Sequence, residues 1–323
     1  MNQTRRQLLQ TAGAMALTGP SLALAQGWPA KPIRLVVPFP PGGLIDNMAR
    51  LIGPRLAQEL GQAVVIDNKP GAGGNIGAAE VARAAPDGYT LLMASPPLTI
   101  SPALYASLPY KPEQINPVAL MGQVPNVLLV NPKSGINSVD DLLARARKAP
   151  GVLNYASNGN GTSLHLSAEL FKSTTGVFIT HIPYRGAAAA VTGLISGEVE
   201  MMFENLPSAL GQIQGGNVRA LAVTTRKRSP TLPNVPTLME LGMKEFEVSA
   251  WFGMAGPAGM EASAVARLEQ ILEKISKEPE IANAMASRGA EPSFMASARM
   301  REFMAADAAK WKRVSSYAKI TLG

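Results

Sequence analysis

The feature that most constrains this chain is a unit that recurs along it. Each unit is a short β-branched run, then a turn rich in glycine, proline or polar residues, then a stretch with helical periodicity. In the first unit these parts are residues 33–37, 38–43 and 44–60. This alternation predicts an α/β fold with mostly parallel sheets flanked by helices. The expected strands are Ile33–Val37, Val64–Asp67, Tyr89–Ala94, Val127–Val130, Leu153–Ala156, Ile179–Pro183, Met201–Phe203 and Ala220–Thr224.

The remaining helices are predicted from periodicity and capping signals. A helix is expected over 78–84, and another ends at Ala149 after Ser138, a good N-cap with two acids in the first turn that follows. From Ala262 onward the chain is expected to be mostly helical.

Two apolar segments flanked by glycine and proline are predicted to be strands that cross between two lobes. They are Val124–Val130 and Val248–Ala255. On this interpretation lobe 1 is residues 26–123 plus 253–323, and lobe 2 is the inserted piece 124–252. A chain of 323 residues is long enough for two such lobes.

The first 25 residues are interpreted as an export signal of the twin-arginine type. Arg5 and Arg6 precede a mildly apolar run over 12–24, and Ala23-Leu24-Ala25 supplies a small-x-small cleavage site before Gln26. An N-terminal amphipathic helix fits this order of motifs less well, and the general secretory route stays an alternative. Either route predicts export to the periplasm. No other segment approaches the roughly 18 apolar residues that span a bilayer.

Composition excludes several kinds of site. The chain has no cysteine, so it forms no disulfide, thiolate nucleophile or zinc–thiolate centre. Its two histidines, His165 and His181, lack metal-ligand spacing with each other or with an acid. The one basic run, 226–228, stands in an expected loop without aromatic platforms. We therefore expect no metal, no cofactor and no nucleic acid, while the net charge of +7 favours anionic ligands.

Four turns between a strand and a helix are candidates for ligand binding. Such a junction offers unpaired backbone N–H groups at the positive end of a helix dipole, which suits a carboxylate or phosphate. In an open α/β sheet these junctions lie at the carboxyl ends of the strands, where ligands bind. The candidate residues in the four turns are Phe39, Pro40, Gly42, Gly43, Asp46, Ser157, Asn158, Gly161, Thr162, Tyr184, Arg185, Glu204 and Asn205.

Several of these residues have a structural explanation beside the functional one. Asp46 falls in a first helical turn, where it can compensate the dipole or contact a ligand. The polar turn 156–163 favours ligand binding over simple capping. Arg185 can clamp a carboxylate or lie exposed on the surface. Asn205 can serve as the cap of a helix that begins near Pro207.

Nucleotide-binding and catalytic motifs match poorly. The glycines of 71–77 have the wrong spacing for a dinucleotide fingerprint and no acid follows at the expected distance, so a tight turn is favoured. The chain has neither a Gly-x-Ser-x-Gly elbow nor a phosphate loop with its lysine. Asp140 and Asp141 are explained by their place at a helix start. No nucleophile and base can be paired from the sequence.

The motifs along the mature chain resemble the Bug-type periplasmic solute-binding receptors of tripartite tricarboxylate transporters. The resemblance covers nearly all of the mature chain and rests on Val37-Pro38-Phe39-Pro40-Pro41-Gly42-Gly43, Asn68-Lys69-Pro70-Gly71-Ala72-Gly73-Gly74-Asn75-Ile76-Gly77, Ala85-Pro86-Asp87-Gly88-Tyr89, Ser157-Asn158-Gly159-Asn160-Gly161, Pro183-Tyr184-Arg185-Gly186, Asn205-Leu206-Pro207-Ser208 and Ser249-Ala250-Trp251-Phe252-Gly253.

The resemblance implies a two-lobe periplasmic binding protein, type II-like, with two crossover strands and a small carboxylate in the cleft. It implies that backbone N–H groups and ordered water of the loops after the first strand of each lobe hold the carboxylate. The matching positions are 39–43 with Asp46, and 157–162. It also implies membrane subunits of such a transporter as partners, and we expect a monomer.

Three positions depart from the family pattern. Ile45 stands where a threonine commonly precedes the aspartate, and Glu204 stands where an aspartate is common. Ser95, a further candidate contact, opens a Ser-Pro-Pro-Leu stretch in place of one that often carries Thr, Gly or His. These changes predict a more apolar pocket than in an amino-acid receptor.

Three hypotheses for function follow. The first is a non-enzymatic transport receptor for a mono- or dicarboxylate. The second is a sensory binding protein that reports its ligand to a signalling receptor. The third is a hydrolase or isomerase, for which Asp46 with His165 or Glu204 is the least unfavourable acid–base pair.

Overall fold

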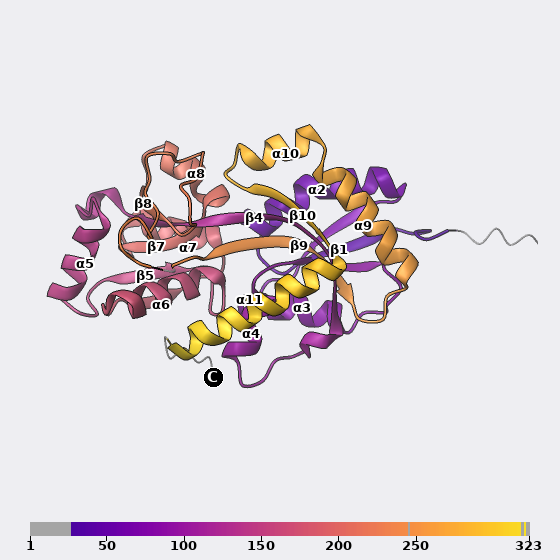
Figure 1. Ribbon diagram of the computed structural model, residues 1–323, viewed down its shortest axis with the longest axis horizontal. Coiled ribbons are helices and arrows are strands. Elements are labelled where there is room, and N and C mark those ends of the chain that lie inside the picture. The colour runs from indigo at the N-terminus through magenta and orange to yellow at the C-terminus, as the bar shows by residue number, and fades with distance from the viewer. Residues whose placement is uncertain (1–26, 245, 318–319, 321–323) are drawn as a thin grey trace, which may run out of the picture.

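The computed structural model describes residues 27–244, 246–317 and 320. The predicted leader and its cleavage site lie outside these residues. Figure 1 shows two groups of strands and helices side by side, with the long strands β4 and β9 running between them. The predicted α/β architecture with two lobes is therefore confirmed. The lobe boundaries at 123/124 and 252/253 stay predictions.

Lobe 1 is built around three parallel strands. β1 (Ile33–Val37) lies between β2 (Val64–Asn68) and β3 (Thr90–Ala94). Each strand is followed by a helix, because an apolar run that alternates with an amphipathic stretch buries both against one sheet. The helical segments here are α2 (Leu44–Leu60), the 3₁₀ turn Ala72–Gly74, α3 (Asn75–Ala82), α4 (Pro97–Leu104) and the 3₁₀ turn Pro112–Gln114.

The two crossing strands are longer than the sequence predicts. β4 (Ile115–Val130) and β9 (Ser249–Pro257) pair with each other antiparallel along most of their length. β9 also pairs with β3, and β4 pairs with β7 (Met201–Asn205). The strand order is β2-β1-β3-β9-β4-β7-β5-β6, so one curled, mixed sheet continues through both lobes. The predicted strand Val127–Val130 is the end of β4.

Lobe 2 repeats the construction of lobe 1. β5 (Asn154–Ser157) lies parallel to β6 (Thr180–Pro183) on one side and to β7 on the other, while β8 (Arg219–Val223) pairs antiparallel with β4. Ser138 is the predicted N-cap, since its hydroxyl accepts a hydrogen bond from the N–H of Asp141. The helical segments are the 3₁₀ turn Pro132–Ser134, α5 (Val139–Lys148), α6 (Ser163–Thr175), α7 (Ala187–Ser196) and α8 (Leu206–Gln214).

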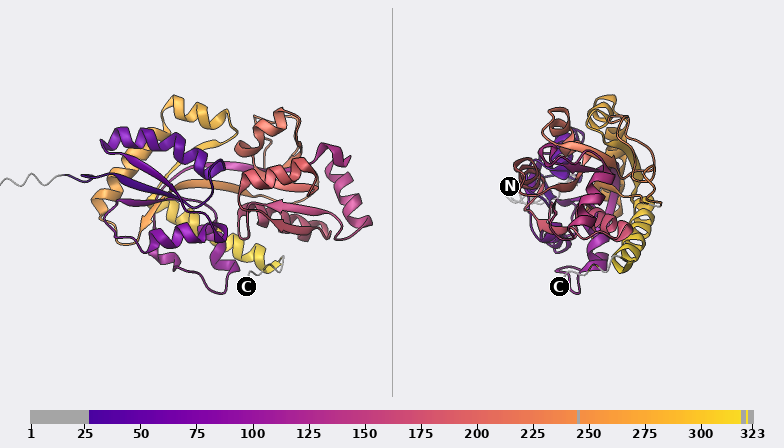
Figure 2. Two further views of the ribbon diagram at one scale, coloured as in Figure 1. Left: turned by 180° about the vertical axis from the view of Figure 1, so that it is seen from behind. Right: turned by 90° about the vertical axis from the view of Figure 1, so that its left-hand side faces the viewer.

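The C-terminal segment returns to lobe 1 and then extends back along lobe 2. It contains α9 (Ala262–Ser276), α10 (Pro279–Ala286), β10 (Glu291–Ala296) and α11 (Ser297–Tyr317). The segment is mostly helical, as predicted, and β10, which pairs antiparallel with β4, is a strand that the sequence did not predict. Figure 2 shows α11 (yellow) running beside both lobes. Met300 packs in the lobe 1 core, whereas Trp311 packs with residues of lobe 2.

Hydrophobic packing follows the same division. One large buried cluster lies between the lobe 1 sheet and helices α2 and α9, and another lies between the lobe 2 sheet and α5 and α6. None of the described helices combines the length and the apolar character that a membrane crossing requires.

Candidate functional site

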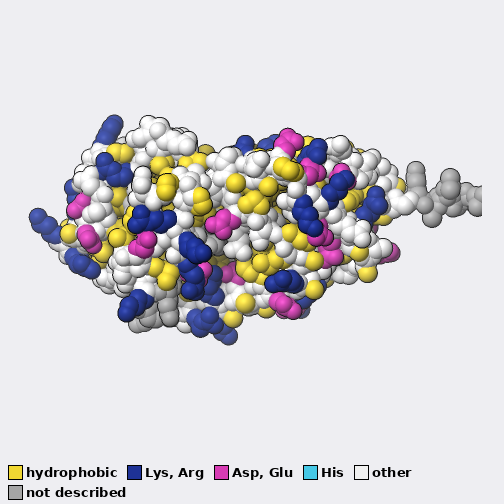
Figure 3. Space-filling view, turned by 45° about the horizontal axis from the view of Figure 1, so that its top comes forward, with side chains coloured by type: hydrophobic (Ala, Val, Ile, Leu, Met, Phe, Trp, Pro, Cys, Tyr) yellow, Lys and Arg dark blue, Asp and Glu magenta, His cyan; other side chains and the backbone are white. Residues whose placement is uncertain are grey.

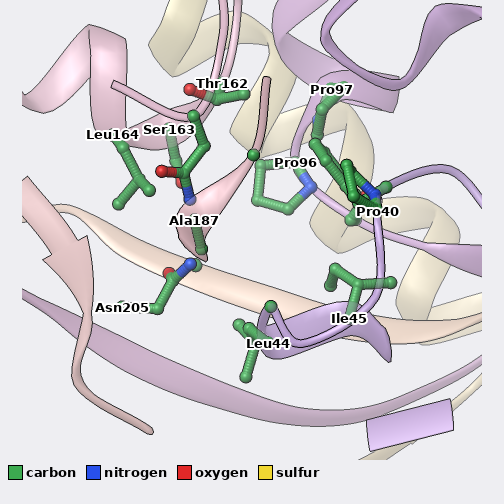
Figure 4. A pocket seen from close by; sticks show the side chains of 16 residues that line it. Pro40, Leu44, Ile45, Pro96, Pro97, Thr162, Ser163, Leu164, Ala187 and Asn205 are labelled. Carbon is green, nitrogen blue, oxygen red and sulfur yellow. The ribbon is translucent and has the colours of Figure 1, made fainter. Parts of the chain in front are cut away.

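An inner cavity lies between the lobes and encloses about 500 Å³, part of it open to solvent. Its lining comes from residues at the start of α2 and α4 in lobe 1, residues at the start of α6 and α7 in lobe 2, Asn205 directly before α8, and Ala250 of β9. In Figure 4 the rings of Pro40, Pro96 and Pro97 lie opposite Leu164 and Asn205. The predicted crevice at the carboxyl ends of the strands is therefore formed by both lobes.

Helix N-termini supply the electrostatics of this cavity. α2 and α7 begin after Gly43 and Gly186, and neither glycine provides a side-chain cap. The N–H groups of a first helical turn have no acceptor within the helix and carry the positive end of the dipole. α6 is capped by Thr162, whose hydroxyl accepts from the N–H of His165, which leaves the N–H groups of Ser163 and Leu164 at the cavity.

No charged side chain of the described residues lines the inner cavity. Its wall is mostly apolar, with Phe39, Leu44 and Leu164 beside the polar groups of Ser95 and Asn158. An anion here would interact with peptide dipoles and hydroxyl groups rather than with a cation. This arrangement fits the anion-binding property of helix N-termini.

An outer cavity adjoins the inner one and shares Phe39, Pro40, Asn158 and Gly186 with it. It encloses about 1230 Å³, open to solvent, and it also contacts the glycine-rich turn 71–74. Predicted residues Tyr184 and Arg185 line this outer cavity. Figure 3 shows Lys and Arg side chains spread over one face of the molecule.

The carboxylate of Asp46 braces the first loop. One oxygen, Oδ2, accepts from the N–H of Gly42 at 2.9 Å and from Arg50 Nε at 2.9 Å, and Oδ1 accepts from Asn68 Nδ2 at 3.0 Å. Burial alone would raise the pKa of Asp46, but these hydrogen bonds outweigh burial and hold it below its usual value. Asp46 does not line either cavity. The geometry therefore supports a role in holding the loop rather than a contact with the ligand.

One buried histidine, His165, and one half-buried histidine, His181, lie beside the start of the second loop. Ser157 Oγ lies 2.7 Å from His181 Nε2, and the rings of His181 and His165 stack with their centroids 4.3 Å apart. Burial lowers the pKa of His165 to about 4 and that of His181 to about 3. Ser157 is fully buried and lines neither cavity, so the serine–histidine pair does not offer a nucleophile to either cavity.

Glu204 is the second-last residue of β7, which leads directly into α8. Its side chain is completely buried, and burial raises its pKa to about 7 although hydrogen bonds from Asn205 and Asn158 oppose the shift. Oε1 accepts from the backbone N–H of Asn205 at 2.8 Å and from Asn158 Nδ2 at 3.4 Å. Both asparagines line the inner cavity, and Glu204 lies behind them.

The structure brings together many of the residues proposed from the sequence. In the inner cavity it places Phe39, Pro40, Gly43, Ser95, Asn158, Thr162 and Asn205. Five other predicted residues line neither cavity: Gly42, Asp46, Ser157, Gly161 and Glu204.

Two of the predicted backbone donors have partners within the protein. The N–H of Gly42 donates to Asp46, and the N–H of Gly161 lies 3.3 Å from His165 Nδ1, so both amides already have internal partners.

Sequence reasoning also missed part of the lining. It left out Ala187 at the start of α7, Pro96 and Pro97 at the start of α4, and the turn 71–74 in the outer cavity. The signal for Ala187 was present, since Gly186 precedes a helix as Gly43 does. The turn 71–74 was interpreted only as a packing turn.

Comparisons with known proteins agree on one family. The family model described as "Tripartite tricarboxylate transporter family receptor" matches residues 48–319. Protein BugT of Bordetella pertussis is 40% identical over 319 residues, which is 97% of this chain and 97% of that protein.

Two solved structures have similar folds. The R. palustris protein Rpa4515 with adipate has a TM-score of 0.88 and 37% identity, covering 91% of this chain and 99% of that one. MatC from Rhodopseudomonas palustris with bound malate has a TM-score of 0.84 and 29% identity, covering 89% and 99%.

Proposed function

This chain belongs to the tripartite tricarboxylate transporter receptor family, and from that premise we propose that it binds a small mono- or dicarboxylate between its lobes. Receptors of this family are periplasmic solute-binding proteins rather than enzymes. The bound acid would then pass to the membrane subunits of a tripartite tricarboxylate transporter.

The observation that carries the proposal is the convergence of helix N-termini on a cavity without cations. α2 approaches from lobe 1 and α6, α7 and α8 approach from lobe 2, so an anion between them would contact both lobes at once. A ligand that interacts with both lobes only when they are closed favours the closed form. Capture of an anion and closure of the cleft would thus be one event.

The apolar wall supports an aliphatic acid. Phe39, Leu44 and Leu164 line the space between the polar ends of the cavity, and two similar proteins were solved with adipate and malate. We propose an aliphatic mono- or dicarboxylate as the ligand.

Isothermal titration calorimetry on the mature chain tests the proposal. A panel of aliphatic and aromatic acids would be titrated, each next to its uncharged amide; adipate and adipamide form one such pair. We expect saturable one-to-one binding of at least one acid and no binding of its amide, because the peptide dipoles at the cavity select for negative charge. A panel without any binder would contradict the proposal.

Delivery to a transporter and export through the leader need separate measurements. Intact mass spectrometry of the periplasmic protein should give a chain that begins at Gln26. Deletion of the gene should reduce uptake of the acid identified by calorimetry, and the exported protein should restore that uptake. Normal uptake in the deletion strain would favour the sensory alternative.

A further inference from the structure

Glu204 is unusual among the buried carboxyl groups of the described residues. Three such groups are buried: Asp46, Glu204 and Asp307. Asp46 forms an ion pair with Arg50, and Asp307 forms one with Lys310. Glu204 has no cationic partner in the described part of the chain, although its side chain is fully inaccessible to solvent. A buried charge without a partner is strongly unfavourable, so this position calls for a neutral carboxyl group.

The hydrogen bonds around Glu204 point to the same state. Oε1 has two donors, from Asn205 and Asn158, whereas Oε2 has no partner among the described residues. The side-chain oxygens of Asn158 and Asn205 are also buried without a described donor. All the buried atoms of these three side chains that lack a described partner are therefore acceptors. A proton on Oε2 would supply the donor that the group lacks.

No neighbouring element neutralises Glu204. α7 and α8 contain no ionisable side chain, and neither does the part of β4 that pairs with β7. The ionisable groups on the other packed elements are Tyr155 of β5 and His165, Glu169 and Lys172 of α6, and none of them contributes to the pKa shift of Glu204. On α2, Asp46 is held by Arg50.

We propose that binding of a carboxylate in the inner cavity is coupled to uptake of one proton by Glu204, which makes Glu204 a positioning residue for Asn158 and Asn205. The inference rests on the proposed function. One O–H bond forms at Oε2, the proton comes from solvent, and no other bond changes. The ligand's negative charge next to Asn158 and Asn205 disfavours a second negative charge directly behind them, so the bound protein holds the neutral acid.

The coupling predicts a pH profile with a definite sign. In the ligand-free protein the pKa of Glu204 is about 7, and a bound anion raises it further. Below that value the group is already neutral and affinity is independent of pH. Above it, binding must first protonate the group, so affinity falls by about tenfold for each pH unit until the pKa of the bound form is reached.

Calorimetry with adipate and malate tests the coupling in the full mature chain. Titrations at about pH 8 in buffers of different ionisation enthalpy would count the protons taken up, with close to one expected for the native protein. Glu204→Gln is neutral at every pH and keeps an acceptor oxygen for both asparagines, so it should bind without proton uptake and with a flat pH profile. Glu280→Gln, which removes an exposed carboxyl on α10, should behave like the native protein.

The outcomes separate this inference from the proposed function. Failure of both acids to bind at about pH 6, where Glu204 is largely neutral, would contradict the proposed function together with the coupling. Binding without proton uptake, or an equal pH profile in the native protein and Glu204→Gln, would overturn the coupling alone. A purely structural role would lower the melting temperature of Glu204→Gln but would not flatten its pH profile.

Discussion

At the scale of single residues, the inner cavity obtains its positive potential from peptide groups, because no charged side chain of the described residues lines it. Asp46 illustrates this division, because its carboxylate holds Gly42, Arg50 and Asn68 around the first loop instead of facing the ligand. The loop is thereby fixed before any ligand arrives. A fixed loop lowers the entropy that binding has to overcome.

Asp46→Asn should destabilise the protein by about 1–3 kcal/mol, because it removes the ion pair and converts one acceptor oxygen into a donor facing Arg50 or Gly42. The pKa of Asp46 is depressed in the folded state. Its stabilising effect is therefore present above the unfolded value of about 4 and is lost as pH falls through the folded pKa. Urea unfolding at several pH values should show the native protein and the variant converging in acid. A constant difference in unfolding free energy would contradict this role.

Gly43→Val should weaken ligand binding at least about tenfold with little loss of stability. A Cβ at position 43 would lie 3.7 Å from Ala187 Cβ, so the two methyl groups of valine would enter the cavity between α2 and α7. The φ angle of Gly43 is −85°, which valine adopts without strain. Calorimetry and thermal unfolding would measure both quantities. Gly211→Val, at an exposed site with open space around it, is the matched control.

Single residues also decide how much of the site could be predicted from the sequence. The turn residues of the sequence predicted that Gly43, Asn158 and Asn205 lie at the cavity, since glycine and capping residues mark the starts of helices. The pairing of the Gly42 and Gly161 amides could not be predicted in the same way. Their partners, Asp46 and His165, stand four residues further on, and only the side-chain rotamer decides whether they turn back to the loop.

At the scale of elements, one buried carboxylate joins α11 to α4 and to the crossing strand β9. Asp307 Oδ2 accepts from Thr99 Oγ1 of α4 at 2.7 Å, from Trp251 Nε1 of β9 at 3.2 Å and from Trp311 Nε1 at 3.1 Å. The start of α4 lines the inner cavity, and β9 is a crossing strand. The network thus joins the ligand cavity, the crossing strands and the C-terminal helix.

Asp307→Ala should lower the unfolding free energy by about 3 kcal/mol or more. The change leaves two indole N–H groups without their acceptor, each at the cost of its desolvation, and leaves the Thr99 hydroxyl with only the Pro96 carbonyl as acceptor. Thermal unfolding followed by tryptophan fluorescence would report the loss, because two of the chain's three tryptophans donate to Asp307. Glu302→Ala removes an exposed acid of the same helix and should leave stability within about 0.5 kcal/mol. Equal effects of the two changes would contradict the network.

The elements differed in how well the sequence predicted them. β1 and α2 have the predicted bounds because an apolar run and an amphipathic stretch meet at a clear glycine–proline turn. β4 was predicted too short at its start, where Pro117 disfavours a strand, and the structure accommodates Pro117 beside a register shift. β10 was missed for the same reason: Glu291 and Pro292 disfavour a strand unless a partner such as β4 lies alongside.

At the scale of the whole molecule, glycines allow the two lobes to meet across the cleft. A Cβ on Gly73 would collide with the carbonyl oxygen of Asn160, and a Cβ on Gly186 would lie 2.9 Å from Pro40 Cγ. Each pair joins lobe 1 to lobe 2. These contacts connect loops far apart in the sequence, so they could not be predicted from local patterns, and they are the reason that the turn 71–74 belongs to the outer cavity.

The same contact geometry allows closure to be tested directly, by a disulfide between Gly43→Cys and Ala187→Cys. The 3.7 Å separation between a Cβ at position 43 and Ala187 Cβ falls within the range of about 3.5–4.5 Å found in disulfides. The native chain has no cysteine, so no other pairing competes within one molecule. Mild oxidation should therefore produce a single intramolecular bond, visible as a mass loss of two hydrogens.

The bond should hold the two lobes in the closed arrangement. Small-angle scattering should give one radius of gyration for the oxidised variant with or without ligand. The reduced variant should be larger without ligand than with it, because ligand exchange requires the lobes to separate. Each single cysteine variant controls for the substitution itself. If the oxidised and reduced forms gave equal radii and exchanged ligand equally fast, the lobes would not open, and a mechanism of capture by closure would be excluded.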